Sequence, residues 1–144
     1  YESLIAQKYV IDLDTSSLIQ RALEAYVTIG RFQAHLRRSR QTYRQRRDAM
    51  LRAIERYLPA GVRVQPPLGG LFIWMQLPEG MSCSELVPLA QEAAICFAAG
   101  TKFFPQHSQG EAFLRLNFVT QREDTIEEGI RRLGQALQRL SENL

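Results

Sequence analysis

The sequence predicts an α+β fold: a small antiparallel or mixed sheet with helices packed on one face, preceded by a helical arm. Two observations lead to this prediction. Apolar residues recur with helical spacing in several long stretches, and short stretches rich in β-branched and aromatic residues lie between them. From residue 31 onward the predicted order is helix, strand, strand, helix, strand, strand, helix. We therefore divide the chain into an arm, residues 1–30, and one small α+β domain, residues 31–144.

The arm is expected to contain a helix over about 16–29. Asp14 or Thr15 is a suitable N-cap for it, and Gly30 is a suitable stop. The preceding residues 1–10 show little polar pattern and no start signal. Because a globular domain rarely begins in mid-pattern, we expect the chain to be a piece of a longer protein.

A long helix is predicted over about 32–57, ended by Pro59-Ala60-Gly61. Its apolar stripe is formed by Leu36, Tyr43, Met50, Ile54 and Tyr57. The arginines of the stretch 37–47 fall largely outside this stripe, and they suit either phosphate groups or a solvated helix face. The scarcity of interleaved aromatic residues favours the solvated face. We therefore expect no nucleic acid to be bound by this segment itself.

Four short strands are predicted, at 62–64, 71–77, 95–98 and 112–119. The second follows a turn at Gly69-Gly70, and a loop over 99–110 precedes the fourth. Alternate residues of a strand point to opposite faces. In the fourth strand, one face would therefore carry Phe113, Arg115, Asn117 and Val119, and the other Leu114, Leu116 and Phe118.

Two further helices are predicted from capping-box spacings, Ser82 with Glu85 and Thr120 with Glu123. The first runs to about residue 94, and Pro88 inside it argues for a later start or for a kink. The second continues along an apolar stripe of Ile126, Ile130, Leu133, Leu137 and Leu140.

The composition is that of an ordinary globular protein, with 45% hydrophobic and 23% charged residues and a small net charge of +3. No stretch resembles a signal peptide, and no apolar run approaches the ~18 residues needed to span a bilayer. We therefore expect a soluble protein with no membrane partner. Cys83 and Cys96 lack CxxC spacing and cannot form a metal site unaided, which predicts no metal and a reducing, cytoplasmic location.

Arg115 is the most informative side chain, because its strand neighbours are apolar or aromatic. Burying an arginine is costly unless its guanidinium is paired with a carboxylate, phosphate or carbonyl group. From the pattern alone, an internal ion pair or the polar face of a strand is favoured over a ligand contact. The lysines Lys8 and Lys102 and the histidines His35 and His107 show no catalytic spacing, and no nucleotide-binding glycine motif is present.

Several segments, in this order and spacing, resemble fold-type I pyridoxal-phosphate enzymes of the class I/II aminotransferase group. The segments are 15–20 with Tyr26 and Gly30, 35–38 with Tyr43 and 46–48, 67–74, Leu77-Pro78, 113–118, and 127–130. Together they cover nearly the whole chain. The resemblance implies that residues 31–144 form the C-terminal small domain of such a protein and that residues 1–30 belong to the segment that joins it to the large domain.

The same resemblance implies a binding site. Arg115 would clamp the substrate α-carboxylate, and Gly70 would border the substrate side chain. The ligand would be an amino acid or a 2-oxo acid, the cofactor pyridoxal 5'-phosphate, and the intact protein a homodimer. The family's cofactor lysine, pyridine-nitrogen aspartate and phosphate-binding residues belong upstream of Tyr1, so this chain alone is expected to be inactive and to carry no catalytic or cofactor-binding residue. Where the family often has Pro-Gly, this chain has Ala99-Gly100.

The same pattern is similar to the C-terminal part of MocR-type members of the GntR regulator superfamily. In those proteins an aminotransferase-like domain follows an N-terminal winged helix and senses a ligand through the cofactor. The resemblance therefore implies one of two whole proteins, an amino-acid aminotransferase or a transcription regulator that binds DNA through a further N-terminal domain. The sequence segments 35–38 and 43–48 resemble both groups, so both interpretations stay open.

Overall fold

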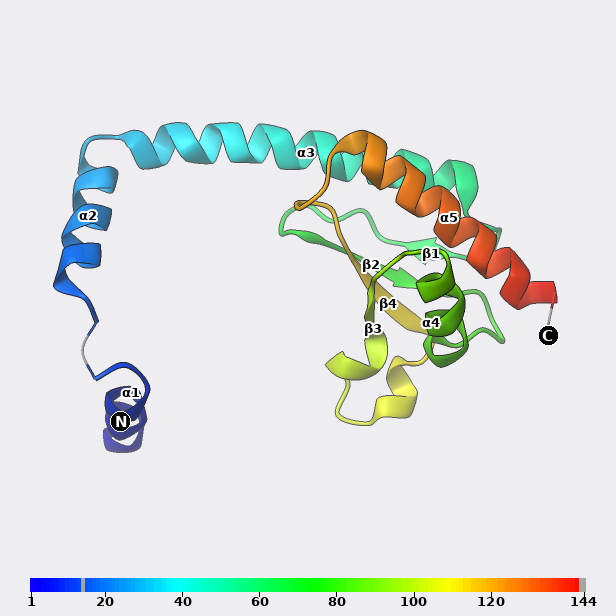
Figure 1. The fold of residues 1–144 in the computed structure, drawn as a ribbon, viewed down its shortest axis with the longest axis horizontal. Coiled ribbons are helices and arrows are strands. Elements are labelled where there is room, and N and C mark those ends of the chain that lie inside the picture. Colours follow the sequence, from blue (N-terminus) through cyan, green and yellow to red (C-terminus); the bar gives the residue numbers. More distant parts are fainter. Residues whose placement is uncertain (14, 143–144) are drawn as a thin grey trace. The chain divides into compact units, whose positions relative to one another are not determined.

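The computed structural model of the chain describes residues 1–13 and 15–142 (Figure 1). The chain divides into two compact units, residues 1–41 and 42–144. The domain boundary predicted after residue 30 stays a prediction: it falls at a turn between two helices, whereas the compact units divide at Gln41. The N-cap predicted at Asp14 lies outside the described residues.

The first unit is helical, as predicted for the arm. It contains α1 (Glu2–Asp12), α2 (Ser17–Thr28) and the beginning of α3 (Arg31–Tyr57). Ser16 is the N-cap of α2, so the alternative cap at Thr15 is wrong. Gly30 adopts a positive φ of 77°, which glycine tolerates readily and which lets the chain turn between α2 and α3. Large apolar side chains of this unit are exposed, among them Leu4, Ile5, Tyr9, Leu18, Ile19 and Leu23.

The second unit is built on an antiparallel sheet of four short strands in the order β1-β2-β4-β3. The strands are β1 (Arg63–Val64), β2 (Phe72–Gln76), β3 (Ala98–Ala99) and β4 (Phe113–Asn117). The two central strands pair along their whole length, with Trp74 opposite Arg115. Side chains from alternate positions of these strands therefore form two separate faces.

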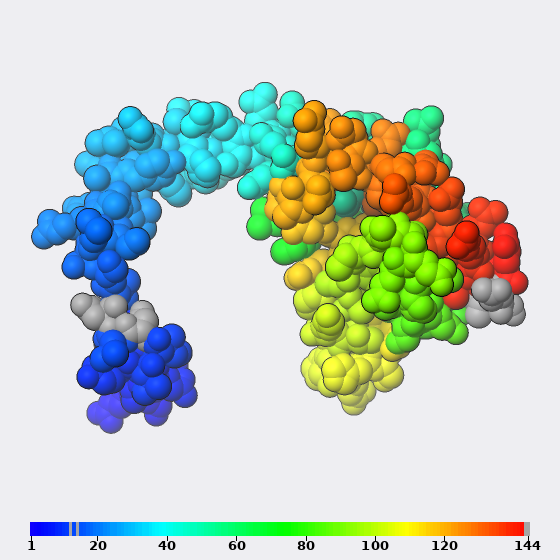
Figure 2. Space-filling view, in the orientation of Figure 1, coloured from blue at the N-terminus to red at the C-terminus, as the bar shows by residue number. Residues whose placement is uncertain are grey.

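One face of the sheet is covered by the second half of α3, α4 (Cys83–Glu92) and α5 (Glu123–Glu142). Figure 2 shows α5, orange to red, packed beside green α4. A single core joins the three helices to this face, through residues such as Ile54, Ile73, Leu86, Leu114, Leu133 and Leu137. The predicted α+β architecture, with its helices on one face of a small antiparallel sheet, is confirmed.

Three local expectations are wrong: the bounds of the third strand, the irregular loop before the fourth, and the cap at Thr120. The third strand is Ala98–Ala99 rather than 95–98, and the predicted loop over 99–110 contains two short 3₁₀ helices, η1 (Gly100–Phe103) and η2 (His107–Gly110). Helix α4 begins at Cys83 despite Pro88, with the Ser82 hydroxyl accepting from the Glu85 backbone N–H as predicted. Helix α5 begins at Glu123, so Thr120 lies too early in the chain to cap it.

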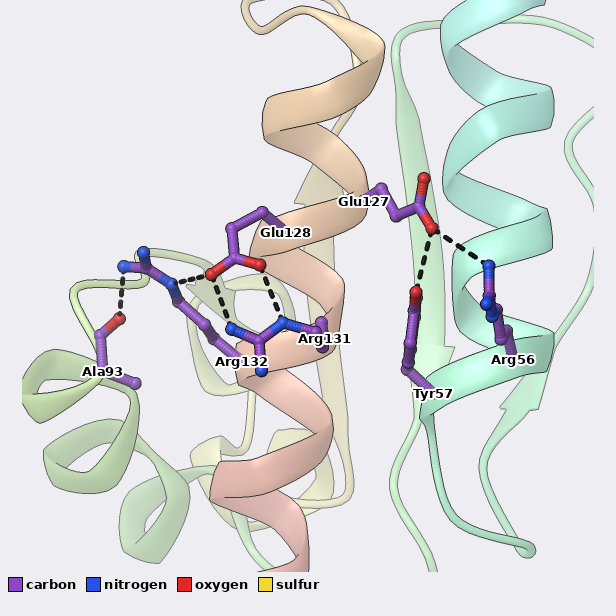
Figure 3. A network of polar contacts seen from close by, with 7 residues as sticks. All are labelled: Arg56, Tyr57, Ala93, Glu127, Glu128, Arg131 and Arg132. Carbon is purple, nitrogen blue, oxygen red and sulfur yellow. Dashed lines mark hydrogen bonds and ion pairs between the residues drawn. The ribbon is translucent and has the colours of Figure 1, made fainter.

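Polar contacts connect α5 to both neighbouring helices (Figure 3). The Glu127 carboxylate accepts from the Tyr57 hydroxyl at 2.9 Å, and this hydrogen bond, together with burial, raises the pKa of Tyr57. The Glu128 carboxylate accepts from Arg131 and Arg132, each at 2.7 Å from Nε. Arg132 also donates to the Ala93 carbonyl oxygen at the end of α4. The network therefore ties α5 to α3 on one side and to α4 on the other.

Replacing Glu128 with glutamine should make stability less sensitive to acid. Hydrogen bonds from Arg131 and Arg132 lower the pKa of Glu128 from its usual 4.5 to about 2. A carboxyl group with a depressed pKa stabilises the folded state above its ordinary pKa, and this stabilisation is lost as the pH falls toward about 2. The thermal midpoint of Glu128→Gln should therefore lie below that of the unsubstituted chain at neutral pH, and the two should converge in acid.

The effect on the thermal midpoint should be modest, because these side chains are partly exposed and screened by solvent. Glu55→Gln, a change at an exposed position on α3, is the matched control. It should leave the midpoint nearly unchanged at both pH values. A difference between Glu128→Gln and the unsubstituted chain that stays constant from neutral pH to about pH 2 would contradict the assignment.

Candidate functional site

The face of the sheet opposite the helices carries Arg115, the first of the two site residues predicted from the sequence. Along β4 this face presents Phe113, Arg115 and Asn117, while Leu114 and Leu116 are buried on the core side. The sequence-based assignment of the two faces is therefore confirmed within β4, whereas Val119, predicted on the same face as Arg115, follows the strand and packs against the core. Arg115 lies between its cross-strand neighbours, Trp74 on β2 and Ala98 on β3.

The guanidinium of Arg115 contacts two aromatic rings. Its central carbon lies 3.9 Å from the ring centroid of Phe72 on β2 and 4.5 Å from that of Phe103 on η1. Within residues 1–13 and 15–142, no carboxylate forms an ion pair with Arg115, and no hydrogen bond to its guanidinium is seen. Of the two structural interpretations that the sequence pattern favoured, the internal ion pair is not found in the described part of the chain, whereas the polar face of a strand stays open.

Four aromatic rings pack together beside Arg115. Trp74 meets Phe103 edge-on, with ring centroids 5.5 Å apart, and stacks on Phe113 at 5.6 Å. Phe104 also stacks on Phe113, with ring centroids 5.6 Å apart. Aromatic pairs of this kind stabilise the folded state by more than the burial of their apolar surface alone. We call Trp74, Phe103, Phe104 and Phe113 the aromatic cluster.

Gly100 and Gly110 pack closely together, and this contact fixes the segment that carries Phe103 and Phe104. A Cβ atom on Gly100 would lie 2.5 Å from the Gly110 carbonyl oxygen and 2.6 Å from that of Phe113. Both glycines are buried. Only residues without a side chain fit here, so η1 and η2 pack backbone to backbone against the start of β4. The sequence predicted a loop in this region and missed the glycine pair, whose members are ten residues apart.

A buried thiol reinforces the same region. The Cys83 Sγ lies at the start of α4 and donates to the Phe113 carbonyl oxygen at 2.6 Å. Burial raises the pKa of this thiol, so it stays protonated and able to donate. The carbonyl group of Phe113 is therefore held by the core on one side while its ring packs in the aromatic cluster on the other.

Gly70, the second predicted site residue, lies at the turn into β2. It has a positive φ of 82°, and a Cβ atom there would meet nothing within 4 Å. The turn is tied to α3 by Arg47, which donates to the Pro67 carbonyl oxygen at 3.2 Å and pairs with Asp48 at 2.6 Å. Two residues beyond Gly70, the Phe72 ring meets Arg115, so β2 connects the two predicted residues.

An open cavity of about 670 Å³ adjoins the aromatic cluster. Its apolar lining comes from the loop before β2 and from the two central strands: Pro66, Pro67, Leu68, Phe72, Trp74 and Phe113. Arg63, Gln65 and Gln76 add polar groups to the lining. The sheet face thus combines the guanidinium of Arg115, whose N–H donors have no hydrogen-bond partner among the described residues, with a neighbouring apolar space. This arrangement suits a small organic anion.

Two curated relatives align with nearly the whole chain. The 2-aminoadipate transaminase of Thermus thermophilus is 40% identical over 139 residues, which are 96% of this chain and 34% of that protein. The aromatic-amino-acid aminotransferase 1 of Thermococcus litoralis is 35% identical over 130 residues, 90% of this chain and 31% of that protein. The chain thus spans about a third of the length of these relatives. No protein-family model matches it.

The structural comparison agrees. The crystal structure of the α-aminoadipate aminotransferase LysN from Thermus thermophilus, complexed with N-(5'-phosphopyridoxyl)-L-leucine, superimposes with a TM-score of 0.88 and 38% sequence identity. The match covers 99% of this chain and 36% of that one. This chain is the C-terminal portion of a fold-type I aminotransferase domain. The predicted family resemblance is therefore confirmed.

Transcription regulators are also among the curated relatives of the chain. The HTH-type transcriptional regulator YdcR of Escherichia coli is 36% identical over 126 residues, 88% of this chain and 27% of that protein. The crystal structure of a kynurenine aminotransferase from Pyrococcus horikoshii, in complex with PMP and with kynurenine as substrate, superimposes with a TM-score of 0.87 at 34% identity. Both classes of whole protein predicted from the sequence are thus among the relatives.

Neither lysine of the chain has the surroundings of a Schiff-base lysine in the described structure. A Schiff-base lysine needs a partly desolvated amine, and both lysines are exposed: Lys8 on α1, hydrogen-bonded to Thr15, and Lys102 on η1. His35 bonds Ser39 and His107 bonds the Thr101 carbonyl oxygen, both at the surface. Across the described ranges no three metal-binding side chains cluster, and no helix has the length and apolar character to cross a membrane.

Proposed function

We propose that this chain is the part of a pyridoxal-phosphate-dependent amino-acid aminotransferase that binds the substrate α-carboxylate through Arg115. The observation that supports it most directly is the guanidinium of Arg115, held over two rings on an open sheet face without an acidic partner in the described ranges. A carboxylate is the planar, bidentate partner that a guanidinium binds best. The ligand would be an amino acid or the corresponding 2-oxo acid.

Gly70 would border the substrate side chain, and the cavity beside the aromatic cluster would receive it. A Cβ atom at Gly70 would meet no neighbour within 4 Å, so the space beside this glycine is open. The apolar side chains of Phe72 and Trp74, which line the cavity, suit the hydrocarbon part of an amino acid. LysN, which shares this fold, was crystallised with a phosphopyridoxyl derivative of leucine. That similarity supports an amino-acid ligand without identifying which one.

The chain alone would bind a ligand without transforming it. Its described residues offer no desolvated lysine, so the pyridoxal phosphate of the intact protein would be held by residues outside this sequence. We also propose that the intact protein is a homodimer, as implied by its resemblance to the family. The role of this portion is therefore to hold and orient the amino acid while another part of the protein supplies the chemistry.

A second candidate is the effector-sensing domain of a transcription regulator. The 36% identity to the regulator YdcR favours it, because the match covers 88% of this chain, close to the coverage by the aminotransferases. Carboxylate binding by Arg115 would then detect an amino acid rather than prepare it for reaction. A basic winged-helix segment at the N-terminus of the intact protein would select the regulator, and a start directly in a cofactor domain would select the enzyme.

Removing the carboxylate from the ligand tests the shared part of both candidates. The intact, cofactor-loaded protein is screened with amino acids for a change in cofactor absorbance, and the best ligand is then compared with its own amide. We expect the amide to bind roughly 30-fold or more weakly, because it lacks the charge that the guanidinium binds. Equal affinities for acid and amide would mean that no cation in the site recognises the carboxylate.

A further inference from the structure

The two rings over Arg115 come from separate parts of the chain. Phe72 lies on β2, opposite Asn117 and diagonal to Arg115 on the same sheet face. Phe103 comes from η1, which follows the edge strand β3. A guanidinium is planar, and stacking on an aromatic ring uses its face while its N–H donors remain in its own plane. Contact with both rings therefore restricts the guanidinium without using the donors that a carboxylate needs.

We propose that Phe72 and Phe103 are positioning residues: they hold the guanidinium of Arg115 in a fixed plane, with its donors directed at the ligand carboxylate, before the ligand arrives. This inference rests on the proposed function, because it assigns to the two rings the task of preparing Arg115 for its ligand. It goes further in stating that affinity depends on side chains that need not touch the ligand at all.

Contacts other than that with Arg115 fix the position of Phe103. Its ring meets Trp74 edge-on, and its 3₁₀ helix begins at Gly100, which packs against Gly110 with no room for a side chain. Phe103 nevertheless remains 43% exposed. The ring is therefore anchored at its base by other aromatic and backbone contacts, and it meets the guanidinium of Arg115 from a half-exposed position.

Pre-organisation should matter here because arginine has many rotamers. An unrestrained guanidinium would have to be ordered by the ligand, and ordering lowers affinity. The contact with Phe103 is also a cation–π interaction, which strengthens where water is excluded. Loss of this ring should therefore weaken carboxylate binding by roughly tenfold, a smaller loss than removal of the guanidinium itself.

The test uses nuclear magnetic resonance on the ¹⁵N-labelled 144-residue chain, with pyruvate as the simplest 2-oxo acid and methyl pyruvate as the uncharged control. The Nε–H signal of Arg115 is assigned by its loss in Arg115→Lys. Ring currents should displace this signal from the position of a free arginine. Phe103→Leu removes one ring, Phe103→Tyr restores it, and Phe104→Leu removes a neighbouring ring that stacks on Phe113.

We expect Phe103→Leu to return the Arg115 signal toward that of free arginine and to raise the dissociation constant of pyruvate roughly tenfold. Phe103→Tyr and Phe104→Leu should stay near the unsubstituted chain in both respects, with circular dichroism confirming that all variants are folded. If Phe103→Leu and Phe104→Leu bind pyruvate equally well, the positioning role is overturned while the carboxylate assignment survives. If pyruvate leaves the Arg115 signal unmoved in the unsubstituted chain, the carboxylate assignment fails, and the positioning role fails with it.

Discussion

Replacing Arg115 with alanine is expected to weaken amino-acid binding to the intact, cofactor-loaded protein by about 2–4 kcal/mol. The loss is large because the carboxylate would be left without a charged partner on a face lined by Phe72, Trp74 and Phe103. Arg115→Lys should recover part of the affinity, since an ammonium keeps the charge but lacks the planar pair of donors. Titration of the cofactor absorbance with the amino acid measures both variants.

Measuring the ligand amide against both protein variants gives a thermodynamic cycle, in which the protein loses the guanidinium and the ligand loses the carboxylate. If Arg115 is the group that binds the carboxylate, Arg115→Ala should lower the affinity for the acid strongly and for the amide hardly at all. Arg52→Ala, a change at an exposed arginine of α3, is the matched control and should leave both affinities unchanged. Equal losses for acid and amide in Arg115→Ala, with the protein still folded, would show that Arg115 does not recognise the carboxylate.

Replacing Gly134 with alanine is expected to destabilise the second unit by about 3 kcal/mol. Gly134 is buried in α5, and a Cβ atom there would collide with the backbone carbonyl oxygen of Tyr57 at the end of α3. A carbonyl oxygen of the backbone cannot turn aside as a flexible side chain can, so α3 and α5 would have to separate. The buried side chains Leu133 and Leu137, which pack in the same core, would then lose contacts. Denaturant unfolding followed by circular dichroism measures the change.

Gly129→Ala provides the matched control in the same helix. A Cβ atom on Gly129 would meet nothing within 4 Å. Alanine favours a helix over glycine by roughly 1 kcal/mol, so this variant should be as stable as the unsubstituted chain or slightly more stable. The same chemical change thus has opposite expected signs at Gly129 and Gly134. Stabilisation by Gly134→Ala would refute the close packing of α3 against α5.

Much of the fold was predictable because its strongest patterns are local. The α5 stripe from Ile126 to Leu140 and the alternation along β4 each arise within one element, and both have the expected burial in the structure. The order of strands and helices followed from these patterns. Core packing then requires the apolar faces of α3, α4 and α5 to meet the apolar face of the sheet.

The failures occur where pairing partners decide the structure. β3 consists of Ala98 and Ala99, whose small side chains carry no strand pattern, and it exists because these residues pair with Arg115 and Leu114 of β4. Thr120 has capping-box spacing with Glu123, yet the chain leaving β4 delays the helix start to Glu123 itself. The spacing of residues within a segment can indicate a short strand or a helix cap, but contacts with neighbouring elements determine whether it forms.

The candidate site was predictable in its central residue but not in its surroundings. An arginine among apolar strand residues stands out in one sequence, but that pattern alone favours a structural role, and the family resemblance is what makes Arg115 a candidate ligand contact. Its contact with Phe103 could not be foreseen, because it depends on the close packing of Gly100 and Gly110 in a segment that reads as a plain loop. The absence of an acidic partner in the described ranges likewise required the structure, since the sequence pattern allowed either an internal ion pair or the polar face of a strand.

Trp74 is the single tryptophan of the chain, and its location has a practical consequence. It lies directly across the β2–β4 pairing from Arg115 and touches Phe103 with its ring. Indole emission responds to changes in nearby charge and in exposure to water, and Trp74 is 37% exposed. The protein therefore carries an intrinsic optical probe at the candidate site, so that ligand binding by this chain can be followed by its own fluorescence without a dye or a bound chromophore.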